Sequence, residues 1–219
     1  MKKRLLCAGL AAAMAVSLTA CGGSAAGTKA EGSSASAEAN SEGGSEAAKV
    51  FKIGGIGPVT GGAAVYGMAV QHGTELAVNE INAAGGINGY PIEFQFQDDE
   101  HDAEKSVNAY NTLKDWGMQV LVGTTTSAPC LAVADKTAAD NMFQITPSGS
   151  VVECAANPNV FRICYSDPDQ GAASATYIGE HKLASKIAVI YDSSDVYSSG
   201  VYEKFAQEAP AQGIEIVAA

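Results

Sequence analysis

The sequence has few cationic residues, and this shortage excludes some classes of partner. It contains 13 Lys and Arg residues against 24 Asp and Glu residues. Three of the cations and none of the acids lie in the first 20 residues, so the rest of the chain carries 10 positive and 24 negative charges, a net charge of −14. Proteins that bind nucleic acids or anionic membrane surfaces present basic patches. The charge balance therefore predicts no nucleic-acid partner and no electrostatic binding to a bilayer.

Signatures of catalysis and of cofactor binding are also scarce. No serine lies in a G-x-S-x-G turn and no His follows in a triad-like setting, which disfavours a hydrolase. The acidic segment 98–104 contains only one His, so it is predicted to be a strand end and a helix cap rather than a metal site. Gly55, Gly57 and Gly61 are spaced G-x-G-x-x-x-G, one residue longer than the dinucleotide fingerprint. We expect neither a metal nor a cofactor.

Cysteine pairs of the C-x-x-C type are missing, which argues against structural zinc and against a thioredoxin-like redox centre. Cys130, Cys154 and Cys164 lie in the part of the chain with globular composition. Two readings stay open for them. Cys154 and Cys164 form a disulfide, as exported proteins often do, or the thiols are free and half-buried.

No apolar run is long enough to span a bilayer. The N-terminal apolar run, residues 5–16, follows Lys2-Lys3-Arg4 and has the flanks of a signal peptide, predicted as residues 1–20. Leu18-Thr19-Ala20-Cys21 matches a bacterial lipobox, which predicts cleavage before Cys21 and lipid attachment to it. Residues 21–48 are mostly Gly, Ser, Ala and Glu, a composition that predicts a flexible linker. The predicted location is the outer face of the bacterial cytoplasmic membrane, with the chain held by its lipid anchor.

From residue 49 onward, strand-length apolar segments alternate with helical patterns. Strands are predicted at 49–56, 91–97, 118–122, 142–145, 160–165, 186–191 and from 214. Helices are predicted to begin near 66, 103, 128, 168 and 197 and to end near 82, 115, 140, 181 and 211. The predicted N-cap of the third of these helices is Ser127 or Ala128, and that of the fourth is Asp167. This rhythm predicts an α/β fold with parallel, Rossmann-like sheets and helices on both faces. The unit that begins near Ser166 has about two strands and two helices, too few for a core of its own, so we expect a fragment of a longer protein.

Two predicted strands end in glycine and small hydroxyl residues. The strand predicted at 118–122 runs into Gly123-Thr124-Thr125-Thr126-Ser127, and the strand predicted at 142–145 runs into Thr146-Pro147-Ser148-Gly149-Ser150. Ligands of open α/β sheets bind at the carboxyl ends of the strands. Ser127 is predicted at a helix N-terminus, which attracts a carboxylate, while Ser148 and Ser150 offer acceptors for an ammonium group. The pattern predicts a site that holds a small polar molecule without transforming it.

A set of motifs spread from about Val50 to the end of the chain points to one family. They are Gly57-Pro58-Val59-Thr60-Gly61, Tyr66-Gly67, the segment 77–89 (AVNEINAAGGING), Asp98-Asp99, residues 123–127, Ile145-Thr146-Pro147, Asp169-Gln170-Gly171 and Tyr191-Asp192. Together they resemble the branched-chain amino-acid-binding proteins, which are the type I periplasmic binding proteins of ABC importers. The resemblance implies a two-lobed fold, with residues 49–165 as the N-terminal ligand-binding lobe and residues 166–219 as the start of an incomplete second lobe.

The resemblance also implies a role for particular residues. Ser127 corresponds to the residue that holds the ligand carboxylate, and Ser148 to one whose main-chain carbonyl meets the ammonium group. Ser150 stands where the family contacts both ends of the zwitterion, and Tyr66 and Tyr197 resemble side chains around the opening. The family's acidic partner of the ammonium group would fall after residue 219. Thr126 and His101 stand where some relatives carry a disulfide.

The function implied is that of an extracellular solute-binding lipoprotein of an ABC importer, not an enzyme. It would capture a free amino acid, branched-chain or another small aliphatic one, by hinge closure and deliver it to a permease and ATPase complex. A receptor for a short amide, urea or a peptide is the alternative, and a surface hydrolase is less favoured.

Overall fold

The computed structural model describes residues 49–219. The predicted signal peptide, the predicted lipid site at Cys21 and the predicted linker lie outside the described residues. Within residues 49–219 no helix has both the length and the apolar character needed to cross a membrane. The described strands form one sheet of five strands and one of two strands, both parallel, as the sequence predicts.

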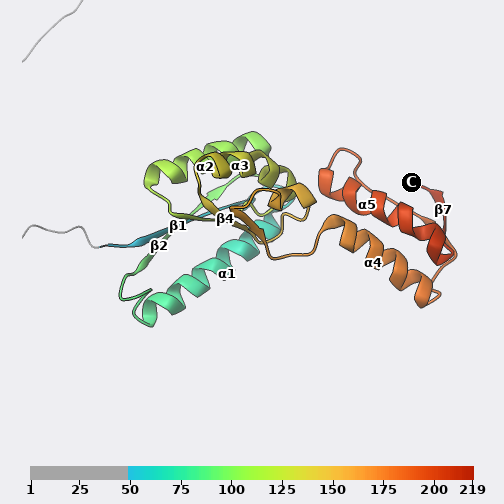
Figure 1. Cartoon of the computed structure of the whole chain (residues 1–219), viewed down its shortest axis with the longest axis horizontal. Helices are drawn as coiled ribbons and strands as arrows, with labels where there is room; N and C mark the ends of the chain where they lie inside the picture. The colour runs from blue at the N-terminus through green and yellow to red at the C-terminus, as the bar shows by residue number, and fades with distance from the viewer. Residues whose placement is uncertain (1–48) are drawn as a thin grey trace, which may run out of the picture. The chain divides into compact units, whose positions relative to one another are not determined.

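The larger sheet is open and parallel, with helices on both of its faces. Its strands are β1 (Phe51–Gly57), β2 (Ile92–Asp98), β3 (Val120–Val122), β4 (Phe143–Thr146) and β5 (Val160–Arg162), in the order β2-β1-β3-β4-β5. Helix α1 (Ala64–Ala83) covers one face, and helices α2 (Ala103–Trp116) and α3 (Ser127–Ala139) cover the other (Figure 1). From β1 the chain adds β2 on one side of the sheet and then β3, β4 and β5 on the other. The switch point therefore lies between β1 and β3, and sheets of this kind bind ligands at the carboxyl ends of the strands there.

The core of this region lies between the sheet and α2 and α3. Fully buried Ile56 of β1 and Leu121 of β3 pack with Leu113 of α2 and Val133 of α3. Helix α2 occupies its predicted place, because Asp102 caps it by accepting a hydrogen bond from the Lys105 amide at 2.8 Å and Gly117 ends it in the left-handed conformation. Packing and capping thus fix the direction in which β1 and β3 deliver the loops that follow them.

The remaining elements lie around a smaller core. They are α4 (Asp167–Glu180), β6 (Lys186–Ala188), α5 (Val196–Glu208), the 3₁₀ turn η2 (Ala209–Gln212) and β7 (Glu215–Ala218). The 3₁₀ turn η1 (Val152–Ala155) packs instead against α3 and β5 of the larger sheet region. Helix α4 packs on α5, and the buried cluster contains Ala175, Phe205, Ala209 and Ile214. Strands β6 and β7 pair only with each other among the described residues.

Two predicted helix caps are wrong by one residue. The N-cap of α3 is Thr126 rather than Ser127 or Ala128, so Ser127 is the first helical residue. The N-cap of α4 is Ser166 rather than Asp167, because the Ser166 hydroxyl accepts from the Asp169 amide at 3.3 Å while the Asp169 carboxylate turns back to the cap. This capping box is a stronger arrangement than a lone Asp cap, since it satisfies two end groups reciprocally.

Candidate functional site

A cavity of about 380 Å³ opens beside the carboxyl ends of β3 and β4. All five residues predicted to contact a ligand line it: Tyr66, Ser127, Ser148, Ser150 and Tyr197. The other lining residues are Ala63, His101, Thr126, Cys164, Tyr165 and Asp195. The structure therefore brings the predicted site residues together in one place, and their contact with a ligand stays a prediction.

Ser127 connects the two loops that form the floor of this cavity. Its hydroxyl oxygen accepts hydrogen bonds from the Ser150 amide at 3.1 Å and from the Val151 amide at 3.4 Å. A hydroxyl has one proton to donate in addition to its two lone pairs. With both lone pairs occupied by amides, the hydroxyl proton of Ser127 is left to donate to a further acceptor.

The N-terminus of α3 offers further donors next to this hydroxyl. Thr126 caps the helix without a side-chain hydrogen bond, and the first amide that returns to it is that of Cys130, which donates to the Thr126 carbonyl at 3.0 Å. Within residues 49–219 the amides of Ser127 and Ala128 donate to no other group, and Pro129 has no N–H. Free amides at the positive end of a helix dipole favour an anion such as a carboxylate.

The loop after β4 lines the same cavity with Ser148 and Ser150. Ser148 is half-buried, and its carbonyl oxygen accepts no hydrogen bond from the described residues. The carbonyl of Ser150 is already occupied, since it accepts from the Asp167 amide at 3.1 Å and from the Arg162 guanidinium at 3.2 Å. The Ser150 carbonyl therefore anchors the loop to the start of α4, and the free carbonyl of Ser148 is the one that can meet an ammonium group.

Several hydroxyl groups in these loops hold the scaffold rather than face the cavity. Thr124 and Thr125 are fully buried, as is Thr146. The Thr146 hydroxyl donates to the Thr124 carbonyl at 2.8 Å, and the Thr125 hydroxyl donates to the Ile56 carbonyl at 3.2 Å. These bonds join the ends of β1, β3 and β4, so the run of Thr and Ser in the sequence contains both structural and cavity-lining groups.

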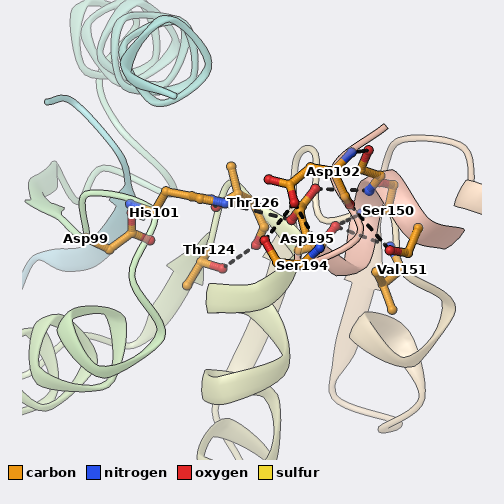
Figure 2. A network of polar contacts seen from close by, with 12 residues as sticks. Asp99, His101, Thr124, Thr126, Ser150, Val151, Asp192, Ser194 and Asp195 are labelled. Atoms are coloured by element: carbon orange, nitrogen blue, oxygen red, sulfur yellow. Dashed lines mark hydrogen bonds and ion pairs between the residues drawn. The ribbon is translucent and has the colours of Figure 1, made fainter. Parts of the chain in front are cut away.

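His101 is a cavity-lining residue that the sequence reasoning did not select. Figure 2 shows its ring between Asp99 on one side and Thr126 and Asp195 on the other. Its Nδ1 lies 2.8 Å from the Thr126 hydroxyl, and its Nε2 lies 3.9 Å from a carboxylate oxygen of Asp195, the N-cap residue of α5. The sequence could have indicated His101, because this residue follows the end of β2, at the same sheet edge as the serines.

Tyr197 reaches the cavity from the second predicted lobe together with Asp195. Its hydroxyl donates to the Gln170 side chain at 3.2 Å, which ties the first turn of α5 to α4. Asp195 in turn accepts from the Ser198 amide at 3.0 Å. The sequence marked Tyr197 through the family resemblance alone, and Asp195 carried no signal beyond its position before a helix.

Burial raises the pKa of two carboxyl groups near the site, those of Asp99 and Asp167. Burial raises the pKa of Asp99 to about 6, the charge of Asp98 adds to the rise, and the hydrogen bond from the His101 amide at 3.0 Å opposes it. Burial also raises the pKa of Asp167, which lies at the start of α4. For Asp98 burial acts in the same direction, but hydrogen bonds from Thr60, Val59 and Glu100 outweigh it and lower the pKa.

The three cysteines among the described residues, Cys130, Cys154 and Cys164, are free, so the structure does not contain the Cys154–Cys164 bridge considered from the sequence. Cys164 is half-buried and lines the cavity, whereas Cys154 is fully buried in η1. Among the described residues no group of His, Cys, Asp or Glu side chains is arranged to hold a metal ion.

In a comparison with known proteins, residues 50–219 match the model of a family described as periplasmic binding protein. A Leu/Ile/Val-binding protein homolog from Brucella melitensis is 34% identical over 155 residues, which cover 70% of this chain and 42% of the relative. A leucine-, isoleucine-, valine-, threonine- and alanine-binding protein from Pseudomonas aeruginosa is 30% identical over 174 residues, 78% of this chain and 46% of the relative.

Solved structures of substrate-binding proteins are also similar to this chain. The branched-chain amino acid transporter substrate-binding protein LivJ from Streptococcus pneumoniae, in complex with isoleucine, superposes with a TM-score of 0.73 at 30% sequence identity. The match covers 78% of this chain and 49% of that one. The chain described here thus spans less than half the length of these curated relatives and about half that of the solved structure.

Proposed function

Because this chain belongs to the periplasmic binding protein family, we propose that it forms part of an ABC-importer receptor that captures a free amino acid, branched-chain or another small aliphatic one. It has the α/β fold of the type I members and is a binding protein, not an enzyme. The observation that carries the proposal is that Ser127, at the N-terminus of α3 with its free amides, and Ser148, with its free carbonyl, line one cavity.

The proposed binding mode follows from the donors and acceptors of this cavity. The ligand carboxylate lies at the N-terminus of α3, where it accepts from the Ser127 hydroxyl and from the amides of Ser127 and Ala128. The ammonium group donates to the Ser148 carbonyl, and the Ser150 hydroxyl lies between the two ends. The ligand side chain extends toward Tyr66 and Tyr197, which line the exposed part of the cavity.

The proposed mechanism is hinge closure between a lobe of residues 49–165 and a lobe that begins at residue 166. Tyr197 and Asp195 belong to the second of these and line the same cavity as the serines. A ligand that contacts both sides favours the closed state by the difference in its affinity for the two states. The closed form would then deliver the amino acid to a permease and ATPase complex.

The N-terminal sequence supports a proposal for location. The lipobox ending at Cys21 and the linker of residues 21–48 would hold the receptor at the outer face of the cytoplasmic membrane. Stable tethering requires more than one acyl chain, because a single one binds a membrane only marginally.

A receptor for a short amide or urea is the second candidate, and the polar lining favours it. His101, Thr126 and Asp195 add hydrogen-bonding groups that a leucine side chain does not use. A ligand screen separates the two candidates.

We expect calorimetric titration of the complete receptor to show binding of leucine, isoleucine, valine or alanine, and no binding of acetamide, urea or a dipeptide. Ser127→Ala should weaken amino-acid binding by about 1.5–3 kcal/mol, which is the range for hydrogen bonds to charged groups and corresponds to roughly 10- to 150-fold. Ser148→Ala is the matched control, since its proposed contact is the main-chain carbonyl and its affinity should stay within about twofold.

The Ser127 variant also removes an acceptor of two amides, so its unfolding by urea must be measured alongside. A variant that remains folded at the titration temperature and binds as tightly as the wild type would reject the assigned role. Binding of urea or acetamide without any amino acid would replace the first candidate by the second.

A further inference from the structure

A histidine connects the capping residues of two helices at the proposed site. The ring nitrogen Nδ1 of His101 lies 2.8 Å from the hydroxyl oxygen of Thr126, the N-cap residue of α3. The other ring nitrogen, Nε2, lies 3.9 Å from Oδ1 of Asp195, the N-cap residue of α5. All three residues line the cavity, and Figure 2 shows His101 pointing toward the other two. The binding mode proposed above gives neither His101 nor Asp195 a contact with the ligand.

The contact between His101 and Asp195 joins the two proposed lobes. His101 belongs to the loop after β2, in the lobe of residues 49–165, whereas Asp195 precedes α5, in the lobe that begins at residue 166. The contact can exist only while the lobes lie against each other beside the cavity. It therefore favours the closed state, in which a ligand contacts both lobes.

Each partner of this pair is held in place by a second contact. Asp195 accepts from the Ser198 amide with its other oxygen, Oδ2, at 3.0 Å, so Oδ1 is left for the ring. The ring of His101 is held by Thr126 through Nδ1, which leaves Nε2 for the carboxylate. Ion pairs at a surface are weak partly because two flexible side chains must be ordered. Here the side chains are 39% and 23% exposed and already fixed, so pairing requires little further ordering.

We propose that His101 and Asp195 form an ion-pair latch between the lobes, which strengthens ligand binding as pH falls. The latch rests on the proposed function, because it acts on the closure that accompanies ligand binding. Histidine side chains change charge between pH 5 and pH 8. In a protonated ring both nitrogens donate, here one to the Thr126 hydroxyl and one toward the Asp195 carboxylate. A neutral ring no longer attracts that carboxylate by its charge, so the latch is weaker at higher pH.

Other charged groups around the ring also respond to pH or to its charge. Asp99 precedes His101 by two residues, and burial raises its pKa to about 6, a rise that the charge of His101 opposes. The ligand carboxylate proposed at the N-terminus of α3 also attracts a protonated ring. The other acidic side chains near the pair are Glu100 and Asp102 beside His101, Asp192 before Asp195, and Asp167, whose pKa is raised by burial and by the charge of Asp195. A pH profile therefore identifies the latch only by comparison with variants that lack it.

Two asparagine substitutions remove the ion pair and keep the local structure. Asp195→Asn retains a side-chain oxygen for the Ser198 amide, and asparagine caps helices as well as aspartate does. His101→Asn retains a polar atom at the position of Nδ1, beside Thr126. The backbone of His101 is left-handed, with a φ of 63°, a conformation that asparagine tolerates well. Both variants retain Asp99.

The first test is calorimetric titration of the complete receptor with leucine at pH 5.5 and at pH 8. In the wild type we expect an affinity about two- to fivefold higher at pH 5.5, which is the range for partly exposed ion pairs. His101→Asn and Asp195→Asn should each lose this gain. Equal affinity of the wild type at both pH values overturns the latch. A gain that persists in Asp195→Asn also overturns it and assigns the effect to the ligand carboxylate or to Asp99.

The second test requires no ligand. Urea unfolding of the 219-residue chain is measured for the wild type, both single variants and the double variant, which together form a double-mutant cycle. We expect a coupling between His101 and Asp195 of about two- to fivefold in the equilibrium constant at pH 5.5, and none at pH 8. No coupling at either pH overturns the latch, whatever the receptor binds. Coupling at pH 5.5 in a receptor that binds no amino acid supports the ion pair and rejects the proposed function.

Discussion

Asp99 shows how a single residue near the site couples stability to pH. Its side chain has no exposed surface, and its Oδ2 atom has no hydrogen-bond partner among the described residues. The largest effect that favours the charged form is the hydrogen bond from the His101 amide, which donates to Oδ1 at 3.0 Å. Burial is therefore the largest cause of its raised pKa, about 6 against the ordinary 3.8.

The sign of the effect follows from this difference. A group with a raised pKa in the folded state contributes stability that is fully present below pH 3.8 and is lost as pH rises through about 6. The difference between the two pKa values corresponds to at most about 3 kcal/mol. We expect Asp99→Asn to gain up to this amount over the wild type between pH 4 and pH 7, measured by urea unfolding at each pH.

Asp98→Asn is the matched control for this prediction. Hydrogen bonds lower the pKa of Asp98, so its contribution is present above pH 3.8 and is lost as pH falls through its folded-state pKa. Its variant should be less stable than the wild type at pH 7, with the gap closing at low pH. If the profiles of Asp99→Asn and the wild type run parallel between pH 4 and pH 7, the carboxyl of Asp99 is not the group responsible.

At the residue scale, the sequence predicted the serines of the cavity but not what each of their atoms does. Strand ends rich in Ser and Gly led to Ser127, Ser148 and Ser150, and all three line the cavity. That Ser127 accepts two amides from the neighbouring loop depends on the contact between segments 23 residues apart, which no local pattern encodes. His101 was missed because the acidic residues around it were interpreted as a helix cap, which Asp102 is.

At the scale of elements, the sequence predicted every described α-helix and strand but not the 3₁₀ turn η1, and the ends of two strands were placed too late. The fifth and sixth strands were predicted to reach residues 165 and 191, and they end at Arg162 and Ala188. The residues beyond them are apolar, but Ile163 is 70% exposed and Ile190 is fully exposed. Apolar pattern indicates a strand only where a neighbouring strand pairs with it, and pairing is not visible in a local window.

Gly67 tests how closely α1 lies against the loop that follows β1. Gly67 is buried, and a Cβ at this position would lie 1.9 Å from the carbonyl oxygen of Pro58. Main-chain atoms cannot move aside as a flexible side chain can, so α1 must shift. We expect Gly67→Ala to lower the free energy of unfolding by about 1–3 kcal/mol, the usual cost of overpacking, and to weaken ligand binding by displacing the adjacent Tyr66.

Gly73 on the same helix provides the control. It is exposed, and a Cβ there meets no atom within 4 Å. Gly73→Ala should raise the free energy of unfolding by about 0.5–1 kcal/mol, because alanine restricts the unfolded chain and favours helix. Chemical denaturation of both variants gives the comparison. Equal stability of Gly67→Ala and Gly73→Ala would show that α1 does not lie against Pro58 in solution.

At the scale of the whole described chain, the alternation of strands and helices predicted the parallel architecture correctly. The strand order β2-β1-β3-β4-β5 places the ends of β3 and β4 side by side, which is why serines 23 residues apart line one cavity. The sequence alone did not show how stable each sheet is. The larger sheet buries a cluster of Ile56, Leu113, Leu121 and Val133, among others, whereas β6 and β7 have no third strand among the described residues.

This contrast predicts two levels of local stability. A two-stranded sheet is marginal in water unless other elements pack on it, and here the packing comes from the cluster around Phe205 and Ile214. Local opening is cheapest where few apolar contacts must break. In amide hydrogen exchange of the 219-residue chain, we expect the amides of β1 and β3 to exchange most slowly and those of β6 and β7 orders of magnitude faster.

Two core substitutions distinguish local opening of the smaller sheet from unfolding of both sheets as one unit. Phe205→Ala removes the largest side chain of the smaller cluster and should accelerate exchange in α4, α5, β6 and β7 while leaving β1 and β3 unchanged. Leu113→Ala, which costs about 2–5 kcal/mol at a fully buried position, should accelerate exchange in β1 and β3 as well. If Phe205→Ala accelerates exchange in β3 as much as in β7, the two sheets unfold as one unit. The smaller sheet would then share the full stability of the larger one, and closing the cavity would require no separately mobile element.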